Sequence, residues 1–308
     1  MKLAVLLVLC ALVIVAAAGL WLYTPDKPRA ALEAAYHIAP TGYRDIAGMR
    51  MRLADSGPKR APALILLHGF GSSLETWDAW VKSLAADFRV IRFDWPGFGL
   101  TGPDPTGDYS DARSLQILAA VMDALGIDRA SLIGNSIGGK LAWMFAAKNP
   151  ARVDRLVLVS PDGFASPGFD YGKKPEVPLM VRALPYTLPA FMVRASMSPA
   201  FGDPTRMDEA LVARYRDFML APGVRPAMIA RMEQVTMVPP EPLLRGVRAP
   251  TLLLWGEKDG MIPVANAADY LRTMPDARLA ALPGLGHVPQ EEAPALSLKP
   301  VLDFLRAP

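Results

Sequence analysis

The feature that most constrains the fold is a series of short apolar runs separated by helical patterns. The runs cover residues 63–67, 88–93, 130–133, 153–159, 251–255 and 278–282, preceded by 43–46 and 49–54 around Ala47-Gly48. Continuous Leu, Ile and Val runs of this length suit parallel strands that are buried on both faces. Because helical stretches such as 110–125 and 140–147 lie between the runs, the sequence predicts a doubly wound, mostly parallel α/β sheet.

The N-terminus is apolar in a different way. Residues 3–23 carry no charge, and a helix of this length spans about 31 Å, roughly the thickness of a bilayer core. We therefore expect residues 1–24 to be a single-pass membrane anchor, with Trp21 and Tyr23 at the interface. The alternative is a cleaved signal peptide, which would leave a secreted or periplasmic protein.

The strand–helix alternation stops for one long stretch. Residues 163–246 contain no convincing buried strand, many prolines and eight of the 15 methionines. These methionines are either packing residues of a helical insertion or the adaptable inner face of a lid over a flexible substrate. The predicted organisation is an anchor, a linker at 25–39, a core at 40–162 and 247–308, and a helical cap at 163–246.

Composition excludes several classes of protein. With 52% hydrophobic and 20% charged residues, the chain is neither disordered, collagen-like nor a coiled coil. A net charge of +3 without a run of Lys or Arg argues against nucleic-acid binding. The single cysteine, Cys10, lies in the N-terminal segment, which excludes a disulfide scaffold and any cysteine-based zinc site.

A nucleophile candidate stands where a predicted strand meets a predicted helix. Residues 134–138 read G-N-S-I-G, the G-x-S-x-G pattern that exposes a serine hydroxyl at a sharp strand-to-helix turn. An ordinary glycine-rich turn is the alternative reading. The position of Ser136 between a strand and a helix favours the nucleophile.

A serine hydroxyl needs a base, and the chain has only three histidines. His37 precedes the sheet, and His68 ends a strand. Only His287 lies downstream of Ser136, as the chain order serine, acid, histidine of this turn requires. We therefore expect His287 to be the base.

The base in turn needs a carboxylate that fixes its tautomer. Asp259 follows the penultimate strand and is the favoured acid, whereas Asp162, just after the strand that ends near Ser160, is the alternative. Asp94 precedes Ser136 in the chain and is expected to tie down a neighbouring loop. The backbone N–H groups of Ile137 and Phe70 are the expected donors to the oxyanion of a tetrahedral intermediate.

Five motifs in order carry a resemblance to a known superfamily. They are HGFGSS (68–73), DWPGFG (94–99), GNSIGG (134–139), WGEKD (255–259) and GHVPQ (286–290). Over residues 40–306 the chain resembles α/β hydrolases, and most of all serine esterases and lipases, including membrane-anchored monoacylglycerol lipase-like proteins. The resemblance implies an eight-stranded sheet with helices on both faces, a helical cap after the sixth strand, and a Ser136–His287–Asp259 triad.

Neighbouring families within the superfamily give the alternatives. Dehalogenases and epoxide hydrolases place an aspartate where this chain has Ser136. The meta-cleavage C–C hydrolases often share the GNSxGG turn but usually carry a tryptophan soon after the histidine, where this chain has Val288-Pro-Gln. Cofactor-free haloperoxidases and perhydrolases use the same triad, and a hydrolase-fold receptor or scaffold is the non-enzymatic alternative.

These observations predict a membrane-anchored serine hydrolase of carboxylic esters. The substrate is expected to be a small ester or lipid, cleaved through an acyl-enzyme. This chemistry needs no metal and no organic cofactor. The expected partners are the substrate and a membrane contacted through residues 3–23.

Overall fold

The computed structural model describes residues 5–7, 9–10, 13, 17, 19–20, 22–37, 41–166, 170–173 and 176–307. Among these, no helix is long and apolar enough to cross a membrane. Many residues of the segment 1–24 lie outside the described ones, and the membrane anchor stays a prediction.

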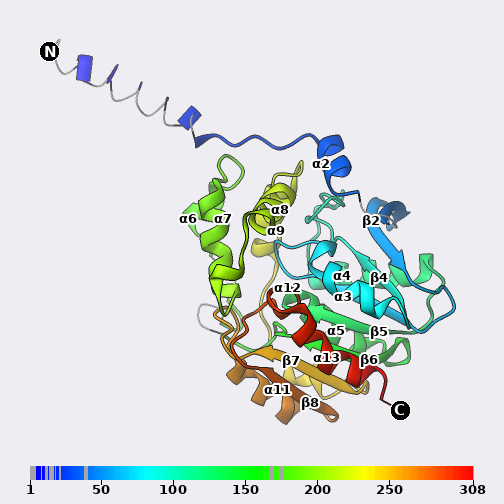
Figure 1. The fold of residues 1–308 in the computed structure, drawn as a ribbon. Coiled ribbons are helices and arrows are strands. Elements are labelled where there is room, and N and C mark those ends of the chain that lie inside the picture. Colours follow the sequence, from blue (N-terminus) through cyan, green and yellow to red (C-terminus); the bar gives the residue numbers. More distant parts are fainter. Residues whose placement is uncertain are drawn as a thin grey trace.

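One eight-stranded sheet forms the centre of the molecule (Figure 1). Its strands are β1 (Thr41–Ile46), β2 (Met49–Ser56), β3 (Ala63–Leu67), β4 (Arg89–Phe93), β5 (Ala130–Asn135), β6 (Val153–Val159), β7 (Thr251–Gly256) and β8 (Ala277–Leu282). Across the sheet they follow the order β1-β2-β4-β3-β5-β6-β7-β8. β2 runs antiparallel to both of its neighbours, and the other adjacent pairs are parallel. The predicted mostly parallel, eight-stranded sheet is confirmed.

The helices lie before, between and after the strands in the chain. They are α2 (Arg29–Ala35), α3 (Asp78–Leu84), α4 (Asp111–Ala124), α5 (Ile137–Lys148), α6 (Leu179–Arg182), α7 (Ala190–Met197), α8 (Glu209–Met219), α9 (Val224–Gln234), α10 (Glu241–Leu244), α11 (Ala267–Thr273), α12 (Pro289–Glu292) and α13 (Pro294–Leu305). Short 3-10 helices cover Leu74–Trp77, Pro150–Arg152, Ser198–Ala200, Pro204–Arg206 and Val264–Asn266. Ser110 caps α4 as expected, because its hydroxyl accepts the N–H of Arg113 at 3.2 Å.

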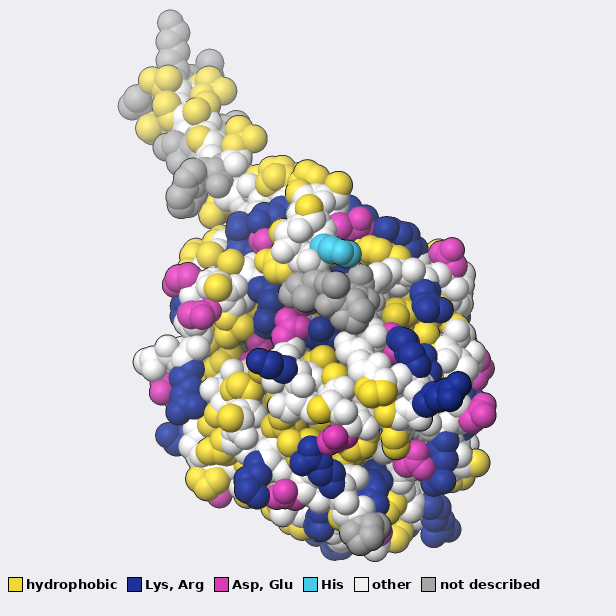
Figure 2. Space-filling model, turned by 45° about the vertical axis from the view of Figure 1, so that its right-hand side comes forward, with side chains coloured by type: hydrophobic (Ala, Val, Ile, Leu, Met, Phe, Trp, Pro, Cys, Tyr) yellow, Lys and Arg dark blue, Asp and Glu magenta, His cyan; other side chains and the backbone are white. Residues whose placement is uncertain are grey.

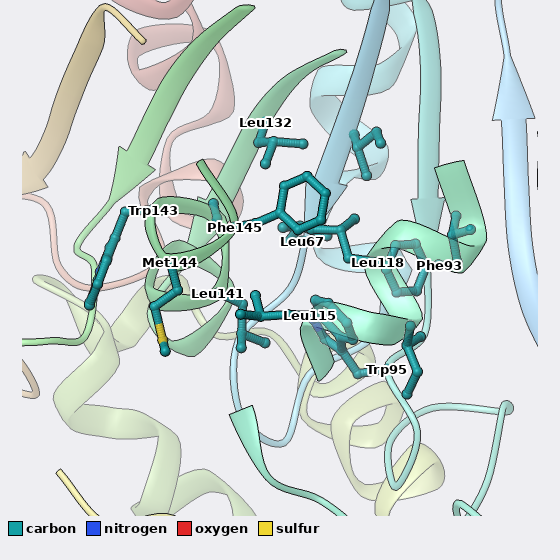
Figure 3. Close-up of a cluster of buried hydrophobic side chains, with 14 of the residues drawn as sticks. Leu67, Phe93, Trp95, Leu115, Leu118, Leu132, Leu141, Trp143, Met144 and Phe145 are labelled. Carbon is teal, nitrogen blue, oxygen red and sulfur yellow. The ribbon is translucent and has the colours of Figure 1, made fainter. Parts of the chain in front are cut away.

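Both faces of the sheet are covered, which explains the continuous apolar runs in the sequence. In β3, Leu64 and Leu66 pack with helices α3 and α13, whereas Ile65 and Leu67 pack with α4 and α5 on the other face. Figure 3 shows Leu115 and Leu118 of α4 and Leu141 and Phe145 of α5 gathered around Leu67 and Leu132 of the strands. Because successive side chains of a strand point to opposite faces, a strand covered on both faces is apolar at nearly every position, as in β3.

Between β6 and β7 lies the cap segment (residues 163–246), which contains helices α6 to α10 (Figure 1). It has an apolar core of its own that includes Leu188, Val193, Met197, Phe201 and Met207. Val288, the residue after His287, belongs to this same cluster. The cap segment therefore packs directly on the loop that follows β8.

Residues 24–36, which we call the strap, join the N-terminal segment to the cap segment. The N–H of Thr24 donates to the carbonyl oxygen of Tyr186 at 2.8 Å, and the Thr24 hydroxyl accepts the N–H of Leu188 at 3.1 Å. Two ion pairs follow, Lys27–Asp217 and Asp26–Arg225, each at 2.6 Å. The strap is thus fixed to the cap segment from its first residue.

The surface mixes charges of both signs. Figure 2 shows basic and acidic side chains interspersed over one face of the globular body, with hydrophobic side chains grouped where the N-terminal segment leaves it. On the cap segment, four large hydrophobic side chains are strongly exposed: Leu179, Met180, Tyr186 and Phe191.

Candidate active site

Ser136 occupies the turn between β5 and α5 in a strained conformation. Its φ is 55° and its ψ is −121°, a region that residues other than glycine rarely adopt. A Cβ atom on Gly134 would lie 2.3 Å from the carbonyl oxygen of Gly138, and one on Gly138 would lie 2.2 Å from that of Leu67. Neither position has room for a side chain, so the G-x-S-x-G spacing is a steric requirement of this turn.

His287 and Asp259 meet although 28 residues separate them in the chain. His287 Nδ1 lies 2.8 Å from Asp259 Oδ2, and the other carboxylate oxygen accepts the N–H groups of Met261 and Ile262 at 2.8 and 2.9 Å. Both side chains are buried. Since the carboxylate accepts the proton on Nδ1, the lone pair of Nε2 remains available to take a proton.

Two glycines allow the loops that carry these residues to touch. A Cβ atom on Gly256 would lie 2.2 Å from the carbonyl oxygen of Gly286. Gly256 ends β7 and Gly286 precedes His287, so the close backbone contact brings the acid and the histidine within hydrogen-bond reach.

The two expected oxyanion donors line the same cavity as Ser136. Ile137 is the first residue of α5, so its N–H has no partner within the helix. Phe70 lies in the turn after β3, and its N–H meets no acceptor among the described residues. Both N–H groups are therefore free to donate to a bound oxygen.

His68 supports the loop that carries Phe70. Its Nδ1 lies 2.8 Å from the carbonyl oxygen of Gly69, and its Nε2 accepts the N–H of Trp95 at 3.0 Å. Complete burial lowers the pKa of this imidazole to about 4. His68 is consequently a neutral side chain that fixes two loops, one at each end of its ring.

The other two aspartates considered above lie apart from His287. Asp94 accepts the N–H groups of Leu74 and Leu100, each at 2.8 Å, so the prediction that it ties down neighbouring loops is confirmed. Asp162 lines the cavity with Ser136, but it is Asp259 that pairs with His287 Nδ1. His37 lines a separate cavity of about 110 Å³.

The cavity next to Ser136 has a volume of about 530 Å³. One part of its wall is apolar and consists of Met232, Val235, Met237, Met261 and Ile262. Two of the eight cap-segment methionines, Met232 and Met237, therefore face this cavity. Met197, Met207 and Met228 are instead buried as packing residues, and the predicted lid role of the other methionines stays a prediction.

Several residues of the site escaped the sequence analysis. Asn135 donates to the carbonyl oxygen of His287 at 3.0 Å. Glu292 accepts the N–H groups of Gly202, Asp203 and Gly286 at 2.8 to 3.1 Å, which joins the cap segment to the histidine loop. Lys140 is buried in the cavity wall, and its one sequence signal is that it stands in the otherwise apolar helix 137–147.

Known proteins resemble this chain along most of its length. A 2-hydroxy-6-oxo-6-phenylhexa-2,4-dienoate hydrolase from Burkholderia cepacia is 29% identical, over 85% of this chain and 93% of its own. A 2-hydroxy-6-oxononadienedioate/2-hydroxy-6-oxononatrienedioate hydrolase from Burkholderia vietnamiensis is 32% identical, over 84% of this chain and 91% of its own. The crystal structure of a bacterial membrane phospholipase A is 25% identical and superposes with a TM-score of 0.75, with full coverage of both chains.

A family model agrees with these similarities and with the geometry of the site. The model of the α/β hydrolase fold matches residues 62–294, which include the turn at Ser136 and the loops of Asp259 and His287. The chain belongs to the α/β hydrolase fold family.

Proposed function

We propose that this hydrolase cleaves carboxylic esters, with Ser136 as nucleophile, His287 as general base and Asp259 as the acid that orients the imidazole. One observation carries the proposal. Ser136, on its strained turn, and His287, bound to Asp259 at 2.8 Å, line one cavity together with two free backbone N–H groups. Acyl transfer needs a nucleophile, an oriented base and an oxyanion site within reach of one carbonyl group.

In the first half of the reaction, Ser136 Oγ attacks the ester carbonyl carbon while its proton passes to His287 Nε2. The negative oxygen of the tetrahedral intermediate accepts hydrogen bonds from the N–H groups of Phe70 and Ile137. Asp259 stabilises the imidazolium through Nδ1. When the intermediate collapses, the C–O bond breaks and the alcohol leaves with the proton of Nε2.

In the second half, water attacks the acyl-enzyme. His287 Nε2 removes a proton from the water molecule, and the same two N–H groups stabilise the second tetrahedral intermediate. Its collapse returns the proton to Ser136 Oγ and releases the carboxylic acid. The apolar wall with Met232 and Met237 supports an acyl chain as the group held there.

Hydrolysis of a C–C bond is the second candidate, and the two Burkholderia relatives favour it. Both are hydrolases of 2-hydroxy-6-oxo-dienoates by name. Against it stands Val288, which follows His287 where such enzymes usually have a tryptophan nearby, and which packs into the apolar core of the cap segment. The two activities are separated by assaying one preparation on both substrate classes.

We also propose that residues 1–24 hold the protein to a membrane and that the cap segment covers Ser136. The similarity to a membrane phospholipase A over the full chain supports the anchor. Met180 and Phe191 of the cap segment are 70% and 71% exposed, which supports contact of this segment with the membrane. The strap links the two, since it leads from the apolar N-terminal residues directly onto the cap segment.

A fluorophosphonate probe and p-nitrophenyl esters test the ester proposal. The wild-type protein is expected to be labelled and to hydrolyse the esters, and Ser136→Ala to lose both, with activity falling by a factor on the order of 10⁶. Ser160→Ala is the matched control, because Ser160 is another serine with positive φ, buried directly after the neighbouring strand β6. Labelling that persists in Ser136→Ala, or turnover of a 2-hydroxy-6-oxo-dienoate without ester hydrolysis, would contradict the proposal.

A further inference from the structure

Part of the cavity wall beside Ser136 is charged and buried, and the mechanism above does not use it. Four side chains, which we call the charged subsite, come from four different segments: Asp111 of α4, Lys140 of α5, Asp162 after β6 and Arg231 of α9. Lys140 and Arg231 are each only 5% exposed. Burying charges is costly unless they are paired or used, so their presence in a cavity that an ester must enter calls for a function.

The two cations share one carboxylate. Lys140 Nζ lies 2.7 Å from Asp111 Oδ2, and Arg231 Nη2 lies 3.6 Å from Asp111 Oδ1. An ammonium group has three N–H donors, and among the described residues Lys140 Nζ has no acceptor other than Asp111. Lys140 therefore retains donors that can serve a molecule in the cavity.

The carboxyl group of Asp162 has free acceptor oxygen atoms. Within the described part of the chain, no side chain donates a hydrogen bond to the carboxyl group of Asp162. Burial raises the pKa of this carboxyl group, and the attraction of Lys140 opposes the rise. In either protonation state it offers oxygen atoms to a hydroxyl group in the cavity.

The mixture of free donors and acceptors decides which chemical group fits. An anion would meet the donors of Lys140 but also the carboxyl groups of Asp111 and Asp162, and Asp111 already balances one of the two cations. An alkyl chain would leave buried polar atoms without partners, which costs free energy. A hydroxyl group both donates and accepts, so it can bind Lys140 and Asp162 together without adding charge.

The charged subsite is close enough to Ser136 to hold the alcohol part of the same ester. The backbone N–H groups of Lys140 and Asp162 both donate to the carbonyl oxygen of Ser136, at 3.0 and 3.1 Å. The backbones of these two subsite residues thus contact Ser136, and their side chains line the same cavity as Ser136. In a glyceryl ester the two free hydroxyl groups lie on carbons one and two bonds beyond the carbon that bears the ester oxygen, so they enter the same cavity as the ester bond.

We propose that the charged subsite binds the free hydroxyl groups of a glycerol-type alcohol, so that the substrate is a monoacylglycerol-like ester. Its acyl chain lies along the apolar wall that contains Met232 and Met237, which we call the methionine wall. This inference rests on the proposed ester hydrolysis. It assigns Lys140 and Asp162 to the alcohol group and leaves Ser136, His287 and Asp259 with the chemistry.

Two octanoate esters that differ only in these hydroxyl groups provide the test. They are 1-monooctanoylglycerol and propyl octanoate, and the measured quantity is the ratio of their kcat/KM values. A hydrogen bond to a charged group is worth about a factor of ten or more, so the wild-type full-length protein should prefer the glyceryl ester at least about tenfold. Because the ratio is taken within one protein, it is insensitive to the fraction of active enzyme.

Variants of the subsite should reduce this ratio. Asp162→Leu removes the acceptor, and Lys140→Met combined with Asp111→Asn removes the donor without leaving a buried carboxylate unpaired. Each is expected to lower the ratio about tenfold, mainly through KM for the glyceryl ester. Lys148→Met, at the exposed end of the same helix α5, is the matched control and should keep the wild-type ratio.

A ratio near one in the wild-type protein, or a wild-type ratio in both subsite variants, would overturn the inference. So would a higher kcat/KM for octanoylglycerol phosphate than for monooctanoylglycerol, because the subsite would then bind an anion. The proposed function fails separately, if neither octanoate ester is hydrolysed. Hydrolysis of both at equal rates leaves that function intact and removes only the glycerol subsite.

Discussion

Acidification should destabilise the folded protein through His68, and its environment sets the size of the effect. Burial lowers the pKa of this imidazole from 6.5 to about 4. Between these two values the unfolded chain binds the proton and the folded chain does not, so the contribution is constant above pH 6.5 and stability falls as the pH approaches 4. Linkage then gives a loss of about 2 kcal/mol at pH 5 relative to pH 8, rising to ~3 kcal/mol below pH 4.

The assay is urea unfolding of the detergent-solubilised protein at pH 8 and pH 5, followed by tryptophan fluorescence. His68→Gln loses contacts at both pH values but has no imidazole to titrate. Its free energy of unfolding should therefore fall by about 2 kcal/mol less than that of the wild-type protein when the pH is lowered from 8 to 5. Other groups titrate alike in both proteins and cancel in the comparison. His37→Gln, at an exposed position, is the control and should follow the wild-type curve. Equal losses in wild-type and His68→Gln would refute the reasoning.

Three further outcomes are expected. Asp259→Asn should lower kcat for p-nitrophenyl esters by about 10⁴, because an amide at this position favours the wrong tautomer of His287; a larger loss in Asp162→Asn would show that the acid is Asp162. Glu292→Gln should cost about 2 to 4 kcal/mol in thermal unfolding, since a buried carboxylate that accepts three N–H groups is replaced by an amide; a change within about 0.5 kcal/mol would contradict this. Elongation of the acyl chain from acetyl to octanoyl should raise kcat/KM, with two buried methylenes worth about tenfold, and a steady decline would show that the methionine wall serves packing alone.

The central strands of the sheet could be predicted because they are buried on both faces. A strand such as β3 is apolar at all its central positions, with Pro62 before it and His68 after it in the sequence. The helices α4 and α8 were also predictable at their first turns, since Ser110 and Asp208 each cap an N–H three residues on. Strand hydrophobicity and helix capping were thus sufficient for elements whose stabilising contacts lie within a few residues in the sequence.

The meeting of Asp259 and His287 could be anticipated for a related reason. Parallel strands end at one edge of a sheet, so residues that follow β5, β7 and β8 converge there. Their catalytic roles stay predictions until the variants are assayed. Glu292 could not be foreseen, because its partners Gly202 and Gly286 belong to the cap segment and to another loop, and no sequence spacing encodes that contact.

The buried position of Lys140 could not be predicted from the sequence either. A lysine on a helix normally faces water, and only the packing of α4, α5 and α9 places this one in the cavity wall. Its neighbours in the sequence give no hint of Asp111, which lies on a different helix. Buried polar groups are specified by the tertiary structure, and they are the positions where reading the chain alone falls short.

The attachment of the strap has a mechanical consequence. Thr24 is hydrogen-bonded to the cap segment at both its N–H and its hydroxyl, directly after the apolar N-terminal residues, so no slack tether separates the two. A pull on a membrane-embedded N-terminus would therefore act on the cap segment at Thr24, and on helices α8 and α9 through the ion pairs Lys27–Asp217 and Asp26–Arg225. In such an arrangement a membrane would hold the enzyme through the cap segment rather than through the sheet that carries Ser136.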